Sequence, residues 1–562
     1  MKNSSKAENW LYAIGMVVIA EIFSLFQPIY TNVDNYIISM VINRVYAEDT
    51  YNMFLNPVLC WITAAAGRVF TGADGFTLVT KLVLLAGIGA ISYFIAVHFR
   101  EWTERLFWGA VLFLLTVEMS LFSDYFMVWS AFFSFVGMIW LLKELQSDKS
   151  RGRRRIAVGT FFICCGLMWR LGGFGLFIPF LLLDTGIHFL FSMHGKTEKI
   201  QYLKKCIRVF GPAILCCLVL LGIDYGYKHS EKYEDSVKFC DAVSAIVDFP
   251  MKSYEEVKDS LPGISQNDYE SLENYLYADT DRITTAYCEN IAVAGKTTAF
   301  HLDWKELISK TYSLIARFYG LMNFRIWCIA LGMMSLLILF SRSVWYHKLE
   351  LILNWGGAYL ILMYLTLEGR LPERIMQSVL YAVMGIVMIL YVRGEKRNIP
   401  QRWKRVVIFL FTAVVLLHLR TVEFTPHQSL WKAQEAATED KWETLYDTDS
   451  VYIWRLSEYY SKPMRDFMKN GKLMSNHFFE HNICSGGWDF NQIYDKEHRE
   501  ELGVSNPVKA LLSREHTYYI AENCTNMWIY LKEHYNESVL AVQVGAIEGI
   551  TIWKFEIEKT SA

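Results

Sequence analysis

Long apolar runs, separated by short polar segments, fill the first three quarters of the chain. A transmembrane helix needs about 20 predominantly apolar residues, and eleven stretches fit that pattern. The fifth and sixth stretches meet at Arg170-Leu171-Gly172-Gly173, so they can also be one long buried segment with a break. The expected spans are, in order, 10–29, 76–98, 106–122, 125–142, 156–170, 173–192, 207–223, 323–341, 350–367, 375–392 and 406–420.

A different pattern follows the first span. Residues 36–70 alternate apolar and polar positions at helical spacing, which is typical of helices that lie on a membrane and do not cross it. We therefore expect 30–75 to form a first outer loop with interfacial helices. Asp34 lies where the first span leaves the lipid.

Basic residues set the orientation of these spans. Hydrophobic residues make up 53% of the chain, and its net charge of −2 hides a segregation of lysine and arginine into a few loops, so no nucleic-acid partner follows from composition. The positive-inside rule then predicts a multi-pass plasma-membrane protein with a cytoplasmic N-terminus. The short loops on the outer side hold only Arg44, Arg68, Arg170, Arg370 and Arg374.

Two hydrophilic regions, 224–322 and 421–562, then lie outside the cytoplasm. The first predicts short amphipathic helices at 253–259 and 268–278. The second mixes predicted strands with helices, which indicates a small α/β or α+β domain. We expect an α-helical polytopic membrane protein of about 11 transmembrane helices, with a membrane domain at 1–420, an extracytoplasmic helical loop at 224–322 and a C-terminal domain at 421–562. The predicted strands are 451–454, 517–520, 538–544 and 550–557, and the predicted helices of the tail are 457–469 and 526–534.

Cysteines and histidines outside the cytoplasm give weak signals. Cys240 and Cys288 in the loop, and Cys484 and Cys524 in the tail, permit one disulfide in each region, although spacing cannot prove pairing. The segment His477-Phe478-Phe479-Glu480-His481 spells an inverted zinc-protease motif. Because asparagines and a glycine turn bound it closely, we favour two surface histidines beside a partly buried Phe pair.

Ionisable residues converge on the outer face, where they are costly and usually mark a function or a buried pair. Arg370 and Arg374 can clamp a phosphate bidentately. Asp34 can take a proton from a hydroxyl or hold a divalent cation, and Asp124 can orient an acceptor or share that cation, Mg²⁺ or Mn²⁺. The residues of this face are Asp34, Asp124, Arg170, Glu368, Arg370 and Arg374.

Each of these residues also has a structural interpretation. Asp34 can cap the interfacial helix expected from Tyr36, and Asp124 can cap the fourth span. Arg170 can extend its side chain to the interface. The turn from Glu368 to Arg374 can be an ion-pair cluster that holds two spans together.

The layout resembles the GT-C integral-membrane glycosyltransferases. The segments Asn32-Val33-Asp34-Asn35-Tyr36-Ile37-Ile38-Ser39 and Phe54-Leu55-Asn56-Pro57 are similar to bacterial polyprenyl-sugar-dependent members, as are Phe239 to Pro250 and Ile264 to Tyr269. The resemblance covers residues 1 to about 420. It implies catalytic roles for Asp34 and Asp124, and substrate contacts from Tyr36 and Asn56. Many relatives carry paired acids after the first span, whereas here the second position is Asn35.

The implied reaction is inverting transfer from a polyprenyl-phosphate-sugar donor to an envelope glycan or lipid acceptor, at the bilayer surface. A polyprenyl-linked glycan flippase and a non-catalytic assembly protein are the alternatives. Transporters usually contain internal repeats with broken helices at matching positions, and the uneven spans argue against that. A further hypothesis is that aromatics of the tail stack on sugar rings, although such residues are more often core: Trp442, Trp454, Tyr459, Tyr460 and Trp488.

Overall fold

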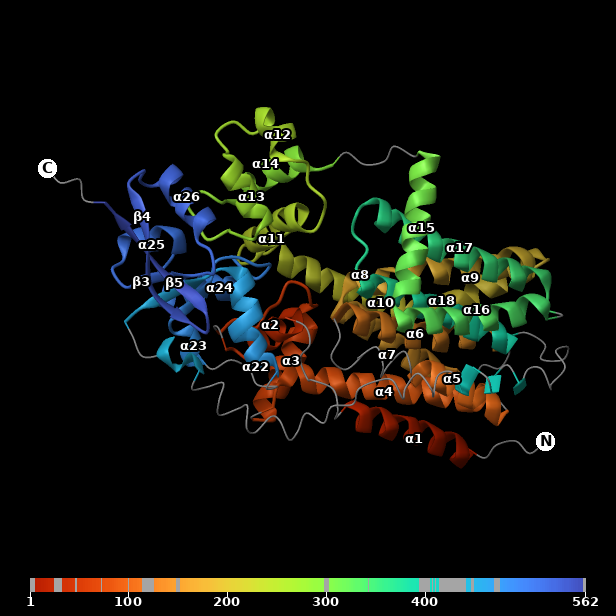
Figure 1. The fold of residues 1–562 in the computed structure, drawn as a ribbon. Coiled ribbons are helices and arrows are strands. Elements are labelled where there is room, and N and C mark those ends of the chain that lie inside the picture. Colours follow the sequence, from red (N-terminus) through yellow and green to blue (C-terminus); the bar gives the residue numbers. More distant parts are fainter. Residues whose placement is uncertain are drawn as a thin grey trace.

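The protein is mainly helical, with a bundle of long helices at one end and a small sheet at the other (Figure 1). The computed structural model describes residues 6–24, 33–45, 48–71, 73–99, 101–113, 126–147, 152–297, 303–341, 343–393, 405–406, 408–409, 411–413, 441–445, 449–469 and 476–558.

Seven described helices are long and apolar enough to cross a membrane, or eight if a bent pair is one span. The bent pair is α15 (Trp304–Gly320) and α16 (Met322–Phe340), which meet at 103°. The seven are α1 (Lys6–Ser24), α4 (Gly75–His98), α6 (Phe126–Leu145), the broken helix α8 (Leu171–Gly175) with α9 (Ile178–Phe191), α10 (Lys196–Lys228), α17 (Trp345–Leu367) and α18 (Glu373–Arg393).

The polytopic helical class predicted from the sequence is confirmed, and the first ten predicted spans coincide with helices over their described residues. The lower number of long spans has local causes. α5 (Trp102–Phe113) is described over 12 residues only, and α7 (Arg153–Trp169) begins with three arginines that shorten its apolar part. Most of the last predicted span, 406–420, lies outside the described residues.

The centre of the bundle is formed by α6 and α18. Eighteen of the twenty residues of α6 are buried, and α18 is buried from Met376 to Leu390. Their aromatic and aliphatic side chains pack together, as where the Tyr381 ring lies 5.8 Å from that of Phe132. A helix that is apolar all round needs this kind of complete enclosure.

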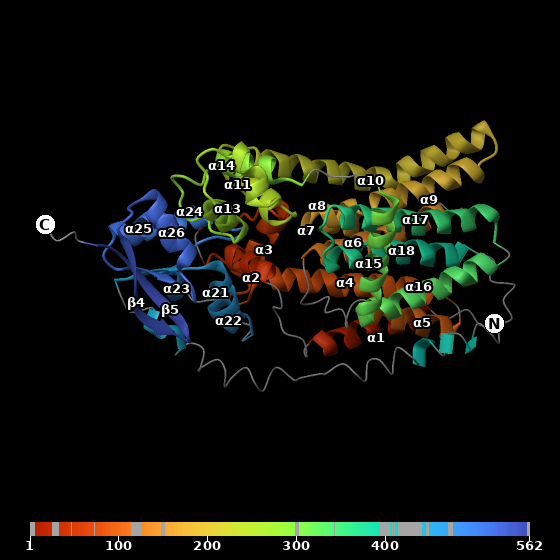
Figure 2. The same ribbon diagram turned by 45° about the horizontal axis from the view of Figure 1, so that its top comes forward.

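Two short helices lie between the bundle and the sheet in both ribbon views (Figure 2). These are α2 (Val33–Ile42) and α3 (Pro57–Val69), which fall in the predicted interfacial loop. One face of α2, with Tyr36 and Met40, belongs to the core of the C-terminal domain, whereas Ile38 and Ile42 belong to the core of the bundle. Helix α2 therefore joins the two parts of the molecule.

The tail contains a five-stranded sheet in the order β2-β1-β3-β5-β4. β1 (Val451–Trp454) pairs in parallel with β2 (Asn482–Cys484) and β3 (Thr517–Ile520), while β5 (Ile550–Ile557) runs antiparallel to β3 and to β4 (Val539–Ile547). The four predicted strands are confirmed, and β2 was missed because it is only three residues long. The helices of this domain are α21 (Leu456–Tyr459), α22 (Arg465–Lys469), α23 (Asn476–Phe479), α24 (Ile493–Glu501), α25 (Pro507–Ser513) and α26 (Thr525–His534).

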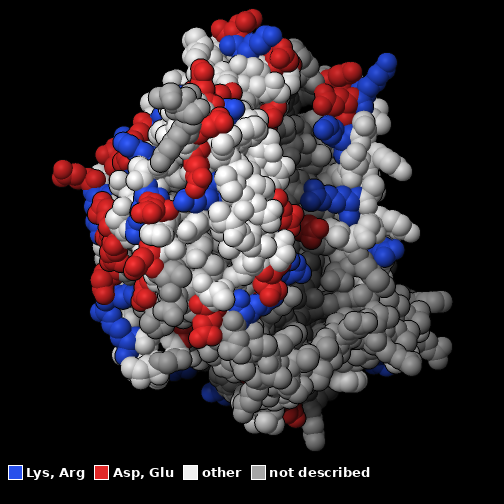
Figure 3. Space-filling view, turned by 60° about the vertical axis from the view of Figure 1, so that its left-hand side comes forward, with Lys and Arg blue, Asp and Glu red and all other residues white. Residues whose placement is uncertain are grey.

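The large loop and the tail share one hydrophobic core, which the sequence did not predict. Loop residue Asp279 is fully buried, and it accepts hydrogen bonds from Asn506, Tyr530 and Tyr535 of the tail at 2.8, 2.9 and 3.0 Å. Besides α15, the described α-helices of the loop are α11 (Glu234–Val247), α12 (Tyr254–Val257), α13 (Gln266–Glu273) and α14 (Thr285–Gly295). Seen from this end, acidic and basic side chains are interspersed over the surface (Figure 3).

The two permitted disulfides are not formed. All four cysteines are free thiols, and Cys240 packs in the core of the bundle whereas Cys288 packs in the shared core of loop and tail. Cys484 instead lies 3.2 Å from the carbonyl oxygen of Gly486, to which its thiol donates. In the histidine motif, the ring Nδ1 of His481 lies 3.1 Å from the Ser450 carbonyl oxygen, which fits the structural interpretation.

Candidate active site

Asp34 lies in the first turn of α2, and α2 begins before it, at Val33. Its Oδ1 accepts a hydrogen bond from the indole N–H of Trp488 at 3.0 Å, across 454 positions of sequence. Burial raises the pKa of Asp34 above its usual range, while the charges of Arg374 and Arg170 and the Trp488 hydrogen bond act in the opposite direction. A carboxylate with a raised pKa is a stronger base, and this one has cations nearby.

Arg170 occupies the break between α7 and α8, as the sequence suggested for this segment. Its carbonyl oxygen accepts a hydrogen bond from the Ser130 hydroxyl at 2.7 Å, which ties the break to α6. The guanidinium carbon lies 4.5 Å from the ring centre of Phe54 and 5.4 Å from that of Phe126. Aromatic rings stabilise a cation without neutralising it, so Arg170 keeps its charge available to an anion.

The turn between α17 and α18 carries Glu368 and Arg370, and Arg374 follows in the first turn of α18. Arg370 forms an ion pair of 2.6 Å with Asp248, which follows α11. Gly369 has a φ of +76°, and a Cβ there would lie 2.5 Å from Cγ of Pro250, so this close approach requires glycine. The turn therefore packs against the large loop. Glu368 caps the end of α17 and is half-buried.

A glycine turn of the tail completes the cluster. Gly486 approaches so closely that a Cβ there would lie 1.5 Å from the carbonyl oxygen of Tyr275. The turn positions Trp488, whose ring centre lies 4.7 Å from that of Phe54. It also positions Asp489, which accepts a 3.3 Å hydrogen bond from Tyr460. Burial and the nearby Asp495 raise the pKa of Asp489 to about 7.

We call the group of Asp34, Arg170, Arg374, Phe54 and Trp488 the Asp34 cluster. Asp34, Arg170 and Arg374 influence one another electrostatically, so three of the predicted residues come together. Asp124 lies outside the described residues. Phe54 and the roles of Asp248 and Asp489 were not predicted. Trp488 was predicted only as a sugar-stacking aromatic, because no sequence signal connects it with Asp34.

Tyr36 and Asn56 have structural contacts in this arrangement. The Tyr36 side chain is fully buried in the core that α2 shares with the tail. The Asn56 side chain accepts from the Val58 N–H at 3.1 Å, which caps α3, and donates to the Leu220 carbonyl at 2.9 Å. Their predicted contacts with substrate stay predictions. Three of the five tail aromatics are fully or almost fully buried, so for Trp442, Trp454 and Tyr459 the core interpretation holds.

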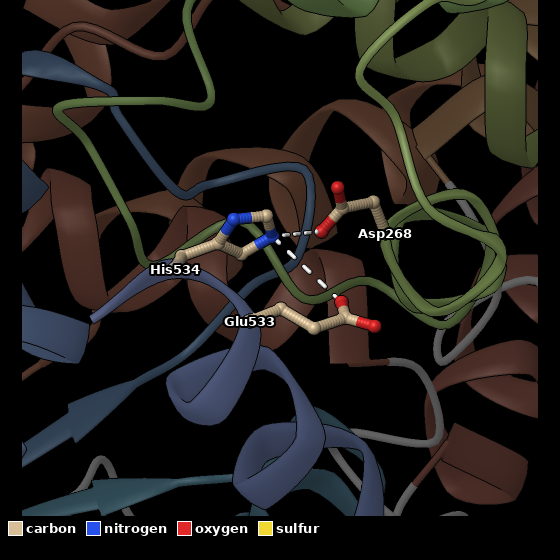
Figure 4. A group of neighbouring side chains, drawn as sticks. All are labelled: Asp268, Glu533 and His534. Carbon is tan, nitrogen blue, oxygen red and sulfur yellow. Dashed lines mark hydrogen bonds and ion pairs between the residues drawn. The ribbon is translucent and has the colours of Figure 1, made fainter. Parts of the chain in front are cut away.

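The positive charges of Arg374 and Arg170 act on Asp34, together with the negative charge of Asp248, and repulsion by the two guanidinium groups disfavours a metal ion at Asp34. A Mg²⁺ or Mn²⁺ ion held by Asp34 and Asp124 stays a prediction. Among the residues that the structure describes, the group with metal-ligand spacing lies elsewhere, where α13 meets α26 (Figure 4). There Nε2 of His534 lies 2.7 Å from Asp268 and 3.9 Å from Glu533, while Ser265 donates to both carboxylates.

An apolar groove of about 450 Å³ lies at the surface of the bundle, between α6, α7, α8, α9 and α10. Phe174, four residues after Arg170, lines it together with Ile207 and Leu218. Arg170, at the break between α7 and α8, is thus close in sequence to a residue of the groove. A ligand with a phosphate and a hydrocarbon tail matches these two chemistries.

Comparisons with known proteins give matches in structure and none in sequence. No family model matches the chain, and no curated protein matches it in sequence. Among solved structures, it is similar to ArnT from Cupriavidus metallidurans bound to undecaprenyl phosphate, with a TM-score of 0.35, and to the same protein in the apo state, with a TM-score of 0.37. Each match covers 98% of both chains at 10% identity. Because identity and TM-score are both low, these matches carry no argument about function, which rests on the residues of this chain.

Proposed function

We propose that the protein is a membrane glycosyltransferase that transfers a sugar from a polyprenyl-phosphate-linked donor to an envelope glycan or lipid on the outer face. The observation that carries the proposal is the Asp34 cluster, in which a carboxylate of raised pKa lies among two guanidinium groups at the end of the bundle. The apolar groove lined by Phe174, four residues after Arg170, supports the same assignment, because it offers room for a prenyl chain.

In the proposed reaction, Arg170 and Arg374 bind the phosphate that links sugar and lipid. The acceptor hydroxyl oxygen attacks the anomeric carbon, and its proton passes to the Asp34 carboxylate. The bond between the anomeric carbon and the phosphate oxygen breaks, and its electron pair leaves with the lipid phosphate, whose negative charge the two arginines stabilise. Attack from the face opposite the leaving group inverts the anomeric centre.

The remaining parts of the cluster position these groups. The Trp488 N–H donates to one oxygen of Asp34 and thereby fixes the orientation of its carboxylate. The rings of Phe54 and Phe126 hold the Arg170 guanidinium in place. Because the two arginines supply positive charge next to the leaving group, the proposed steps need no cation, and a Mg²⁺ or Mn²⁺ ion at Asp34 and Asp124 would be an addition.

The test replaces Asp34 by Asn in the cell that makes the protein. We expect glycan and lipid profiles by mass spectrometry to lose a species one glycosyl unit heavier, at unchanged membrane abundance on a blot. Loss of a general base typically lowers turnover by about 10²–10⁴-fold. Asp281→Asn is the matched control, since Asp281 is an exposed loop carboxylate 3.6 Å from Lys509.

Unchanged profiles with Asp34→Asn would contradict the proposal. A flippase or an assembly protein would then be the better assignment. A profile changed equally by Asp281→Asn would show a general effect of charge on the outer loops, and would also count against a catalytic role of Asp34.

A further inference from the structure

A second cavity, of about 300 Å³, lies at the outer surface, outside the Asp34 cluster. Four segments form it: residues 48–51, helix α3, the end of α10 with the turn that follows, and α24. We call it the Tyr51 pocket. Its wall combines aromatic rings with acidic and basic side chains.

The aromatic residues form a continuous surface. The ring centre of Tyr51 lies 5.3 Å from that of Tyr227 and 4.7 Å from that of Tyr233, and the rings of Tyr227 and Tyr233 are stacked at 5.7 Å. Trp61 lies edge-on to Tyr227 at 5.7 Å and is 49% exposed. Exposed rings of this kind present flat apolar faces to a ligand.

Three carboxylates and one ammonium group are among the residues that line the wall. Asp49 accepts from Lys232 at 2.6 Å and from the Tyr233 hydroxyl at 2.8 Å. Glu497 lies 3.9 Å from the same Lys232, and Glu48 is paired with Arg44. Such a wall offers several carboxylate oxygens as hydrogen-bond acceptors beside aromatic rings. That combination suits a ligand with many hydroxyl groups.

The Tyr51 hydroxyl is a second reason to expect a ligand here. Tyr51 is 7% exposed and lines the cavity, yet its buried hydroxyl has no hydrogen-bond partner among the residues that the structure describes. A buried polar group without a partner costs free energy, and such groups usually have a partner, which can be a ligand. Burial also raises the pKa of Tyr51, so its hydroxyl remains a donor.

The Tyr51 pocket and the Asp34 cluster are built from the same two stretches of chain. Tyr51 lines the pocket, and Phe54, three residues later, contacts Arg170 and Trp488. In the tail, Glu497 lines the pocket and Trp488 holds Asp34. Between them, Gln492 donates to the Met53 sulfur at 3.2 Å, which fixes the two stretches to each other.

We propose that the Tyr51 pocket binds a sugar ring of a glycan acceptor, with the aromatic faces against the ring and the Tyr51 hydroxyl, Asp49 and Glu497 bonded to its hydroxyls. As an acceptor site the proposal rests on the proposed function, because it presents the glycan beside Asp34. The ligand class itself, a polyhydroxyl ring, follows from the pocket alone.

The test measures binding of methyl glycosides of glucose, galactose, mannose and N-acetylglucosamine to the full chain in nanodiscs by saturation-transfer NMR. We expect at least one glycoside to bind. Tyr51→Phe removes only the hydroxyl and should weaken that binding by about fivefold, the value of one hydrogen bond. Trp61→Ala removes an aromatic anchor and should weaken it by about tenfold or more.

Two variants serve as matched controls and should bind as the wild type does. Tyr277→Phe removes another buried hydroxyl without a partner, and Trp304→Ala removes another exposed tryptophan, both outside the pocket. Absence of binding by all four glycosides would overturn the proposal, as would binding that survives Trp61→Ala and Tyr51→Phe. Binding of choline or ethanolamine in place of the glycosides would assign the pocket to an amine and also overturn it.

The outcome is separable from that of the proposed function. Asp34→Asn should keep glycoside binding while it loses transfer. If the glycosides bind but Asp34→Asn leaves the glycan profile unchanged, the Tyr51 pocket is a sugar site and the proposed transferase activity is wrong. Loss of transfer in Asp34→Asn with no glycoside binding would leave a transferase whose acceptor binds elsewhere.

Discussion

Helix α18 has an arginine near each end, and the two lie in opposite surroundings. Arg393 is 7% exposed and pairs with Asp184 at 2.8 Å and Glu350 at 3.2 Å, both fully buried. Arg374, roughly 28 Å away along the helix, belongs with Arg170 to a cluster that contains Asp34. The inner group has one cation for two carboxylates, whereas the Asp34 cluster has two cations for one.

The difference separates a structural group from a functional one. Arg393 is enclosed by Asp184 and Glu350, so its positive charge is neutralised within the protein. In the Asp34 cluster, Arg170 lies against aromatic rings, which do not neutralise its charge, and this favours a role in binding a phosphate. Arg370 is an intermediate case, because its 2.6 Å pair with Asp248 holds the large loop to the bundle.

The largest effect is expected from Arg393→Ala. Removal of one partner from a buried ion pair typically costs about 3–5 kcal/mol, because here Asp184 and Glu350 would remain as buried like charges. Thermal unfolding in detergent should show a much lower midpoint, with lower membrane abundance. The triple variant Arg393→Met, Asp184→Asn, Glu350→Gln should recover most of the loss, and a triple variant as unstable as Arg393→Ala would show that the charges are not the cause.

Replacement of the arginine at the other end of α18 by alanine should lower activity and leave stability unchanged. Arg374→Ala should lower the apparent affinity for the polyprenyl-linked donor by about tenfold, since a hydrogen bond to a charged group contributes about 1.5–3 kcal/mol. The unfolding midpoint should stay near that of the wild type. Glycosyl transfer in isolated membranes at varied lipid-extract concentration gives the kinetics. A large drop in the midpoint would place Arg374 with the structural group.

A smaller effect is expected from Trp488→Phe. The variant keeps an aromatic ring against Phe54 but loses the N–H that holds Asp34. Transfer should fall by about fivefold, in line with one hydrogen bond, and the pH at which activity rises should move upward, because that bond lowers the pKa of Asp34. A pH profile of transfer measures both. A pH profile of Trp488→Phe equal to that of the wild type would mean that Trp488 contributes packing and does not affect the pKa of Asp34.

The smallest effect concerns Asp489. Its pKa in the folded protein is raised to about 7, so the folded state holds a proton that the unfolded state releases near pH 4. The resulting stability is complete below pH 4 and is lost as the pH rises through 7. Unfolding midpoints of the wild type should therefore fall between pH 5 and 8 by more than those of Asp489→Asn. Equal slopes for the two proteins would contradict the shift.

Much of the architecture was predictable from local patterns. The spans follow from apolar runs, and β1, β3, β4 and β5 follow from β-branched and aromatic residues between turns. Asp34, Arg170 and Arg374 were found because charges at membrane depth are rare. Trp488 could not be assigned to Asp34, since a contact across 454 positions leaves no periodic signal. The shared core of loop and tail was missed for the same reason.

The bond between Trp488 and Asp34 also has a consequence for biosynthesis. Asp34 emerges from the ribosome early, and its helix enters the membrane region while most of the chain is still unmade. Trp488 is translated last among the residues of the cluster. The membrane helices of the nascent protein can therefore be in place before the cluster is complete, and the cluster is completed only when the tail folds against α2.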